Sequence, residues 1–92
     1  MTKYELLVSQ TARKQLRILD ERTGERIKKA LTEISDDPTH SRPKADISRL
    51  KGPKRDYFRL RVGDYRVVYA IEGSQILVVR IFHRSSGYSW LE

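Results

Sequence analysis

Cationic and aromatic side chains recur at strand spacing in the second half of the sequence. Arg59 and Arg61 stand two residues apart, so in a strand they share one face. Further side chains of this kind follow downstream: Arg66, Arg80, His83, Arg84 and Tyr88. On a sheet, guanidinium groups bind phosphates, and aromatic or guanidinium planes stack on splayed bases. The pattern therefore indicates a surface for RNA.

The same side chains also have a purely structural interpretation. Strand arginines that face solvent are common, and Arg80 could be ion-paired or reach the surface from a buried stem. Three tyrosines of the same region suit half-buried packing in a sheet: Tyr57, Tyr65 and Tyr69. Residue types alone thus predict a small basic domain and leave the role of its basic face open.

The N-terminal segment predicts one strand and one helix. Residues 4–8 are a short β-type run, and Ser9 directly after them can cap a helix. Ala12, Leu16 and Leu19 then recur at helical spacing. This spacing predicts an amphipathic helix of about ten residues.

A second helical pattern follows a break. Residues 20–24 read as the break, and Ile27, Leu31 and Ile34 mark one apolar face after it. Pro38 ends the pattern, because proline restricts the preceding residue and cannot continue the helical hydrogen bonds. Two helices with a short connection form a helical hairpin.

The rest of the chain predicts a loop and then a β-meander. Residues 38–49 are polar and contain two prolines, which is typical of a loop. Alternating or continuous apolar residues then predict three strands, at residues 57–62, 65–71 and 75–82. Gly63-Asp64 and residues 72–74 are the expected hairpin turns between them.

The predicted order βααβββ defines an α+β fold. We expect a small antiparallel sheet, with residues 4–8 added to the meander, backed by the N-terminal helical hairpin. The length of 92 residues suits one domain, residues 1–92. Leu91 and Glu92 are compatible with native sequence or with the remnant of a tag.

Composition excludes several classes of protein. The chain has no cysteine, so it forms no disulfide scaffold and no zinc site with thiolate ligands. The N-terminus has no apolar run typical of a signal peptide or membrane span, which favours the cytoplasm. The net charge is +7, and residues 39–92 carry eleven basic and five acidic side chains. This excess favours a polyanionic partner, either nucleic acid or an acidic protein.

A longer pattern resembles the RelE/ParE toxin superfamily. It comprises Leu50-Lys51-Gly52, the sequence YFRLRVGDYRVVY at residues 57–69, the pair His83-Arg84, and Tyr88. The N-terminal half agrees with ARKQL at 12–16 and ISDDP at 34–38, so the resemblance covers essentially the whole chain. It implies the same fold, a small sheet backed by a helical hairpin.

The resemblance also implies a function. Members are toxins of type II toxin–antitoxin systems, neutralised by a cognate antitoxin, and they bind operator DNA only together with it. RelE-like members enter the ribosomal A site and cut messenger RNA, without a metal or other cofactor and without contact with a membrane. Their chemistry requires deprotonation of a 2′-hydroxyl, stabilisation of a pentavalent phosphate and protonation of the 5′-oxygen.

The resemblance assigns roles to single residues. Arg59 matches a strand lysine with a role in proton transfer, Arg66 and Arg84 match arginines that stabilise phosphate, and Tyr88 matches a tyrosine that stacks on the substrate base. Because guanidinium stays protonated at accessible pH, His83 is the alternative general base. Positioning contacts to ribosomal or messenger phosphate fall on Lys51, Lys54, Arg55 and Arg61.

Two other functions are compatible with the same resemblance. A ParE-like member inhibits DNA gyrase by binding it and cleaves nothing. A member without toxicity acts only as a co-repressor that binds its antitoxin. The combination of Arg59, Arg66, Arg84 and Tyr88 favours the endoribonuclease.

Overall fold

The computed structural model describes residues 4–86, which begin with a strand and a capped helix. Strand β1 (Glu5–Val8) leads directly into Ser9. The Ser9 hydroxyl accepts a hydrogen bond from the backbone nitrogen of Ala12 at 3.0 Å and caps helix α1 (Gln10–Arg17). The predicted cap and helix are therefore confirmed.

Helix α2 (Glu21–Ile34) begins earlier than the sequence pattern indicates. The carboxylate of Asp20 accepts a hydrogen bond from the backbone nitrogen of Thr23 at 3.1 Å and so caps this helix. This hydrogen bonding to Thr23 also lowers the pKa of Asp20 below its ordinary value. Gly24 thus lies in the first turns of α2, and the prediction that residues 20–24 are all a break was wrong.

The sheet has five strands. After α2 the chain forms β2 (Asp46–Lys51), β3 (Asp56–Val62), β4 (Tyr65–Glu72) and β5 (Gln75–His83), followed by the short 3₁₀ helix η1 (Arg84–Ser86). The strand order is β1-β5-β4-β3-β2, with β2 to β5 an antiparallel meander. Strand β1 pairs with β5 in parallel, so the sheet is mixed rather than purely antiparallel. The α+β class and the three predicted meander strands are confirmed.

Strand β2 corrects the prediction of a loop over residues 38–49. Ile47 of this strand is buried and stands opposite Leu60 of β3. Asp46 and Ser48 flank it and point to the other face of the sheet, since neighbouring strand residues alternate. Strand β2 has few apolar residues. Its formation depends on pairing with β3 more than on a hydrophobic pattern of its own.

The hairpin turns fall where the sequence predicts them. Gly63, between β3 and β4, has a φ of 59°, and Gly73, between β4 and β5, has a φ of 57°. Left-handed backbone of this kind favours glycine and matches the twist of the strands that the turn joins. The turns therefore fix the register of the strands next to them, and between β4 and β5 this register shifts at Val68 and Tyr69.

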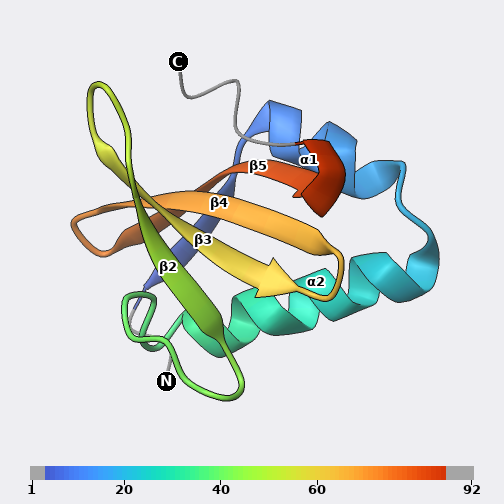
Figure 1. Ribbon diagram of the computed structural model, residues 1–92, viewed down its shortest axis with the longest axis horizontal. Helices are drawn as coiled ribbons and strands as arrows, with labels where there is room; N and C mark the ends of the chain where they lie inside the picture. The colour runs from blue at the N-terminus through green and yellow to red at the C-terminus, as the bar shows by residue number, and fades with distance from the viewer. Residues whose placement is uncertain (1–3, 87–92) are drawn as a thin grey trace.

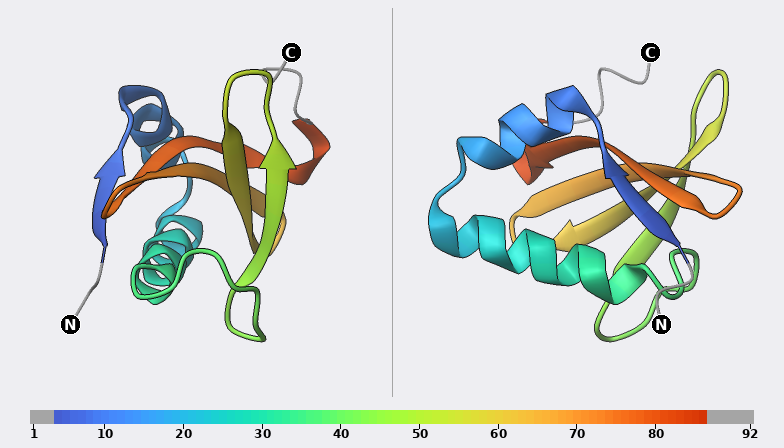
Figure 2. Two further views of the ribbon diagram at one scale, coloured as in Figure 1. Left: turned by 90° about the vertical axis from the view of Figure 1, so that its left-hand side faces the viewer. Right: turned by 180° about the vertical axis from the view of Figure 1, so that it is seen from behind.

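Both helices cover the same face of the sheet. They lie behind the strands in Figure 1 and in front of them in the reversed view of Figure 2. The core fills the space between, with buried residues from both layers: Ala12, Ile27, Leu31, Ile34, Leu60, Val67, Tyr69, Ile76, Val78 and Ile81. Neither helix covers the opposite face, which we call the open face. No helix within residues 4–86 combines the length and apolar composition needed to cross a bilayer.

Tyr69 fastens the segment after α2 to this core. Its ring is fully buried, and its hydroxyl donates a hydrogen bond to the carbonyl oxygen of Pro38 at 2.6 Å. Burial raises the pKa of Tyr69 well above its ordinary range, so the phenol stays neutral. Tyr69 is thus a core residue and not a stacking platform for bases.

Candidate functional site

Four arginines share the open face on three neighbouring strands. Arg59 of β3 stands opposite Val68 of β4, and Val68 stands opposite Arg80 of β5. Two residues further along β3, Arg61 stands directly opposite Arg66 of β4. Cross-strand partners point to the same face. We call these four side chains the arginine face.

The guanidinium of Arg59 is held by two side chains of β2. Its terminal nitrogen Nη2 donates to the Ser48 hydroxyl at 2.9 Å and lies 3.3 Å from Oδ1 of Asp46. Only 21% of the Arg59 side chain is exposed, and its Nε is buried without a hydrogen-bond acceptor among the described residues. The other carboxylate oxygen of Asp46 lies 4.0 Å from Nη1 of Arg61.

Arg66 and Arg84 meet the turn between β3 and β4. Nη1 of Arg66 donates to the carbonyl oxygens of Gly63 and Tyr65 at 3.1 and 3.0 Å. The Arg84 backbone nitrogen donates to the carbonyl oxygen of Asp64 at 2.8 Å, and its Nε lies 3.6 Å from the Asp64 carboxylate. Both arginines are therefore anchored at one end of the sheet.

His83 ends β5 at the same end of the sheet. Its ring contacts Tyr65 edge-on, with 5.4 Å between ring centroids. Nδ1 lies 2.9 Å from the Ser85 hydroxyl and accepts a hydrogen bond from the Ser85 backbone nitrogen at 3.3 Å. The hydrogen bond from the Ser85 backbone nitrogen requires an Nδ1 without a proton, whereas the Ser85 hydroxyl can pair with Nδ1 in either tautomer.

The predicted positioning residues divide between two places. Arg61 belongs to the arginine face, whereas Lys51 ends β2, and Lys54 and Arg55 lie in the turn that follows. Strand β3 separates that turn from the Gly63 turn by seven residues, or about 20 Å. Figure 1 shows the two turns at opposite ends of the sheet.

Arg55 is bound locally at its own end of the sheet. It forms an ion pair with Glu72 at 2.7 Å and lies over the ring of Tyr57, 6.0 Å from its centroid. The structure therefore groups Arg59, Arg61, Arg66, His83 and Arg84, and it leaves Lys51, Lys54 and Arg55 apart from them. Tyr88 lies outside the described residues.

Sequence reasoning missed Asp46 and Ser48. Both belong to β2, which the sequence analysis treated as a polar loop. The alternation of Ala45, Asp46, Ile47 and Ser48 is the signal that could have revealed a strand with two polar residues on one face.

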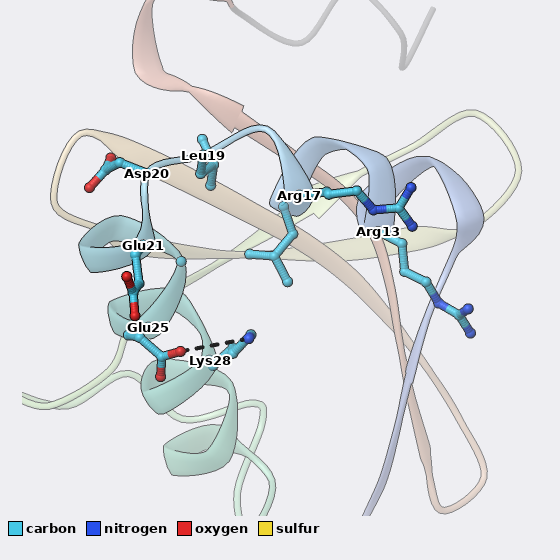
Figure 3. Close-up of a pocket in the computed structure, with 9 residues that line it drawn as sticks. Arg13, Arg17, Leu19, Asp20, Glu21, Glu25 and Lys28 are labelled. Carbon is cyan, nitrogen blue, oxygen red and sulfur yellow. Dashed lines mark ion pairs between the residues drawn. The ribbon is translucent and has the colours of Figure 1, made fainter.

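A second surface feature is the groove between the two helices, shown in Figure 3. It encloses a cavity of about 380 Å³, to which Leu16 and Leu19 contribute apolar surface. Gly24 of α2 also lines it, and a Cβ placed on Gly24 would meet no atom within 4 Å. The space over Gly24 is thus unfilled by the chain's own described side chains.

Opposite charges line the two sides of this groove. Arg13 and Arg17 extend from α1, while Glu21 and Glu25 come from α2. The α2 side is not purely acidic, because Lys28 also lines the groove and pairs with Glu25 at 3.7 Å. Ile18, at the end of α1, is 83% exposed, which is unusual for a large apolar side chain. The groove combines apolar and charged surface of the kind that binds an amphipathic protein segment.

The arginine face offers fixed cations at strand spacing. Guanidinium groups in such an arrangement bind phosphates and stabilise charge that develops on them. Within the described part of the chain, no group of three or more acidic or histidine side chains gathers as a metal site would require.

Comparison with known proteins identifies relatives along almost the whole chain. Residues 6–88 match the family model described as ParE toxin of type II toxin-antitoxin system, parDE. Toxin RelE3 of Methanocaldococcus jannaschii is 31% identical over 86 residues, which cover 94% of this chain and 97% of the relative.

Solved structures agree with this match. RelE in the RelE–RelB complex from Pyrococcus horikoshii OT3 superposes with a TM-score of 0.77 at 25% identity, covering 92% of this chain and 99% of that one. The RelB–RelE antitoxin–toxin complex from Methanococcus jannaschii gives a TM-score of 0.73 at 30% identity, covering 94% and 99%.

Proposed function

The chain belongs to the ParE toxin family within the RelE/ParE superfamily, and from this premise we propose that it is a ribosome-dependent messenger RNA endoribonuclease. The observation that supports this proposal is the arginine face, with His83 and Arg84 at the turn beside Arg66. Its cations lie on rigid strands, which suits a phosphate that must be held while charge develops on it.

The proposed reaction is an intramolecular transesterification. The 2′-hydroxyl of a nucleotide loses its proton and its oxygen attacks the adjacent phosphorus. The bond to the 5′-oxygen then breaks, and that oxygen takes up a proton. The products are a 2′,3′-cyclic phosphate and a 5′-hydroxyl, so no water, metal or cofactor is consumed.

The geometry favours His83 over Arg59 for proton transfer. A guanidinium stays protonated at accessible pH, and that of Arg59 is held by Asp46 and Ser48. The His83 ring is held by its contacts with Tyr65 and Ser85. To take the proton of the 2′-hydroxyl at Nε2, the ring must carry its own proton on Nδ1, where the Ser85 hydroxyl at 2.9 Å can accept it. Arg66 and Arg84 would bind the phosphate oxygens.

The proposed partners are the ribosome with its messenger and a cognate antitoxin. Relatives were solved as RelE–RelB and RelB–RelE complexes, which supports a protein antitoxin for this chain. We place part of that antitoxin in the groove between α1 and α2, where apolar surface and Ile18 are exposed. Acidic residues of the antitoxin would face the arginine face.

A cell-free translation reaction on a defined messenger tests the function. Primer extension should reveal cuts inside codons that appear only when ribosomes occupy them, and Arg84→Ala should abolish them. An intact messenger with undiminished translation would refute the endoribonuclease.

The matching family is described by the name ParE, and this favours a second candidate, a protein that binds DNA gyrase. A supercoiling assay with purified gyrase separates the two. Inhibited supercoiling together with an intact messenger would establish the gyrase inhibitor instead.

A further inference from the structure

We propose that Asp46 is a positioning residue, which holds Arg59 and Arg61 of the arginine face in the orientation that messenger cleavage needs. This inference rests on the proposed function for its catalytic part. Its structural part, a carboxylate that orients two arginines, can be tested without any cleavage.

The geometry gives Asp46 two arginine partners. Its two carboxylate oxygens divide between them, Oδ1 at 3.3 Å from Arg59 and Oδ2 at 4.0 Å from Arg61. Ser48, two residues along the same strand, accepts a further hydrogen bond from Arg59 at 2.9 Å. Asp46 and Ser48, two residues apart on β2, thus both hold the guanidinium of Arg59 on β3, and we call this pair the clamp.

The orientation of Arg59 shows that this clamp acts on it. Nε of Arg59 is buried without an acceptor among the described residues, which costs free energy for a charged donor. Without the contacts to Asp46 and Ser48, the Arg59 side chain would rotate so that Nε gains a hydrogen-bond acceptor. The contacts with Asp46 and Ser48 must therefore outweigh the cost and impose the observed orientation.

The charge of Asp46 has a second effect. Arg61 stands directly opposite Arg66, and like charges at such positions repel. A carboxylate beside Arg61 reduces this repulsion and restrains the side chain. It also repels a phosphate, so Asp46 should weaken the binding of RNA while it improves the geometry for cleavage.

A purely structural role explains this arrangement poorly. The Asp46 side chain is 51% exposed, and its partners are 57% exposed at Arg61 and 21% exposed at Arg59, so only the pair with Arg59 is partly shielded from solvent. Ion pairs exposed to this degree contribute little to folding stability. Asp46→Asn should therefore leave the thermal midpoint almost unchanged.

The experiment compares Asp46→Asn with Asp56→Asn in the full chain. Asp56 pairs with Arg49 at 3.9 Å, and Arg49 lies over the ring of the core residue Phe58. The control thus removes the same charge on the helix-covered side of the sheet. Three quantities are measured: the proton–nitrogen NMR signal of Arg59 Nε, the salt dependence of affinity for a labelled single-stranded RNA, and kcat and KM for messenger cleavage.

In the wild type and in Asp56→Asn, we expect a sharp Arg59 Nε signal that exchanges slowly with solvent. In Asp46→Asn this signal should be lost to exchange. RNA binding should tighten, with a slope against salt steeper by about 0.7, the value for one more phosphate contact on a single strand. Cleavage should lose up to about 100-fold in kcat without a rise in KM.

Two results would overturn the proposal. One is an Asp46→Asn variant that matches Asp56→Asn in the Nε signal and in the salt slope. The other is an Asp46→Asn variant that binds RNA more tightly and also cleaves faster, which would mean that Asp46 only weakens RNA binding and does not position the arginines. If the wild type cleaves no messenger, the proposed function fails, while the NMR and binding comparisons still decide whether Asp46 positions the arginines.

Discussion

Replacing Arg66 by glutamine separates the effect of this side chain on the rate of messenger cleavage from its effect on the stability of the fold. Arg66→Gln removes two hydrogen bonds to the turn carbonyls of Gly63 and Tyr65. It also removes the repulsion from Arg61 directly opposite. Each effect amounts to about 1 kcal/mol or less, and the two have opposite signs. The free energy of unfolding should therefore change by less than about 1 kcal/mol.

The effect on cleavage should be much larger. Loss of one preorganised donor to a developing charge typically costs about 100- to 1,000-fold in kcat, or roughly 2.7–4 kcal/mol. Rates of messenger cleavage in cell-free translation and urea unfolding curves measure the two quantities side by side. Arg22→Gln on α2 removes the same charge at an exposed position away from the open face and serves as the control.

A role for Arg66 in cleavage is refuted if Arg66→Gln cleaves at the rate of Arg22→Gln. It is also refuted if the loss of cleavage follows a matching loss of stability, because Arg66 would then act on the fold.

Three other changes give distinct results. Tyr69→Phe leaves the Pro38 carbonyl without its donor and should cost about 1–3 kcal/mol in urea unfolding. Folded Tyr69 keeps its proton above pH 10 while the unfolded chain loses it, so stability should fall as pH rises beyond about 10, and Tyr69→Phe should lack this component. Gly24→Ala should stabilise the free chain by about 0.5–1 kcal/mol, since its Cβ meets open space, yet weaken antitoxin binding in calorimetry if the groove is the antitoxin site. Arg84→Ala should abolish growth arrest on expression with a nearly unchanged thermal midpoint, since the ion pair with Asp64 is exposed; a fully toxic variant would remove Arg84 from the site.

Local patterns predict the meander and its turns well. The alternation around Phe58 and Leu60 reflects a strand with one face in the core, and Gly63 and Gly73 occupy positions that need positive φ. Such features depend on neighbours in the sequence, so a single sequence reveals them. Strand β2 escaped prediction because its place depends on pairing with β3, a contact between segments.

The candidate site shows the same limit. Spacing alone assigned Arg59 and Arg61 to one strand face, and the resemblance supplied roles for these and for the later arginines. The hold of Asp46 on Arg59 depends on the register between β2 and β3, which no local pattern encodes. Sequence therefore predicted that Arg59 and Arg61 share a face, but neither the separation of Lys51, Lys54 and Arg55 from them nor the restraint on Arg59.

The parallel pairing of β1 with β5 affects when the sheet can form during synthesis of the chain. Glu5 pairs with Gln75, and the Gln75 amide donates to the Glu5 carboxylate across 70 residues of chain. Contacts this distant in sequence form late and slowly, because the intervening chain must first be closed into a loop. A nascent chain cannot complete its sheet until β5 has left the ribosome that makes it. Synthesis thus delivers an unfinished sheet first, and the arginine face, to which β5 contributes Arg80, is complete only afterwards.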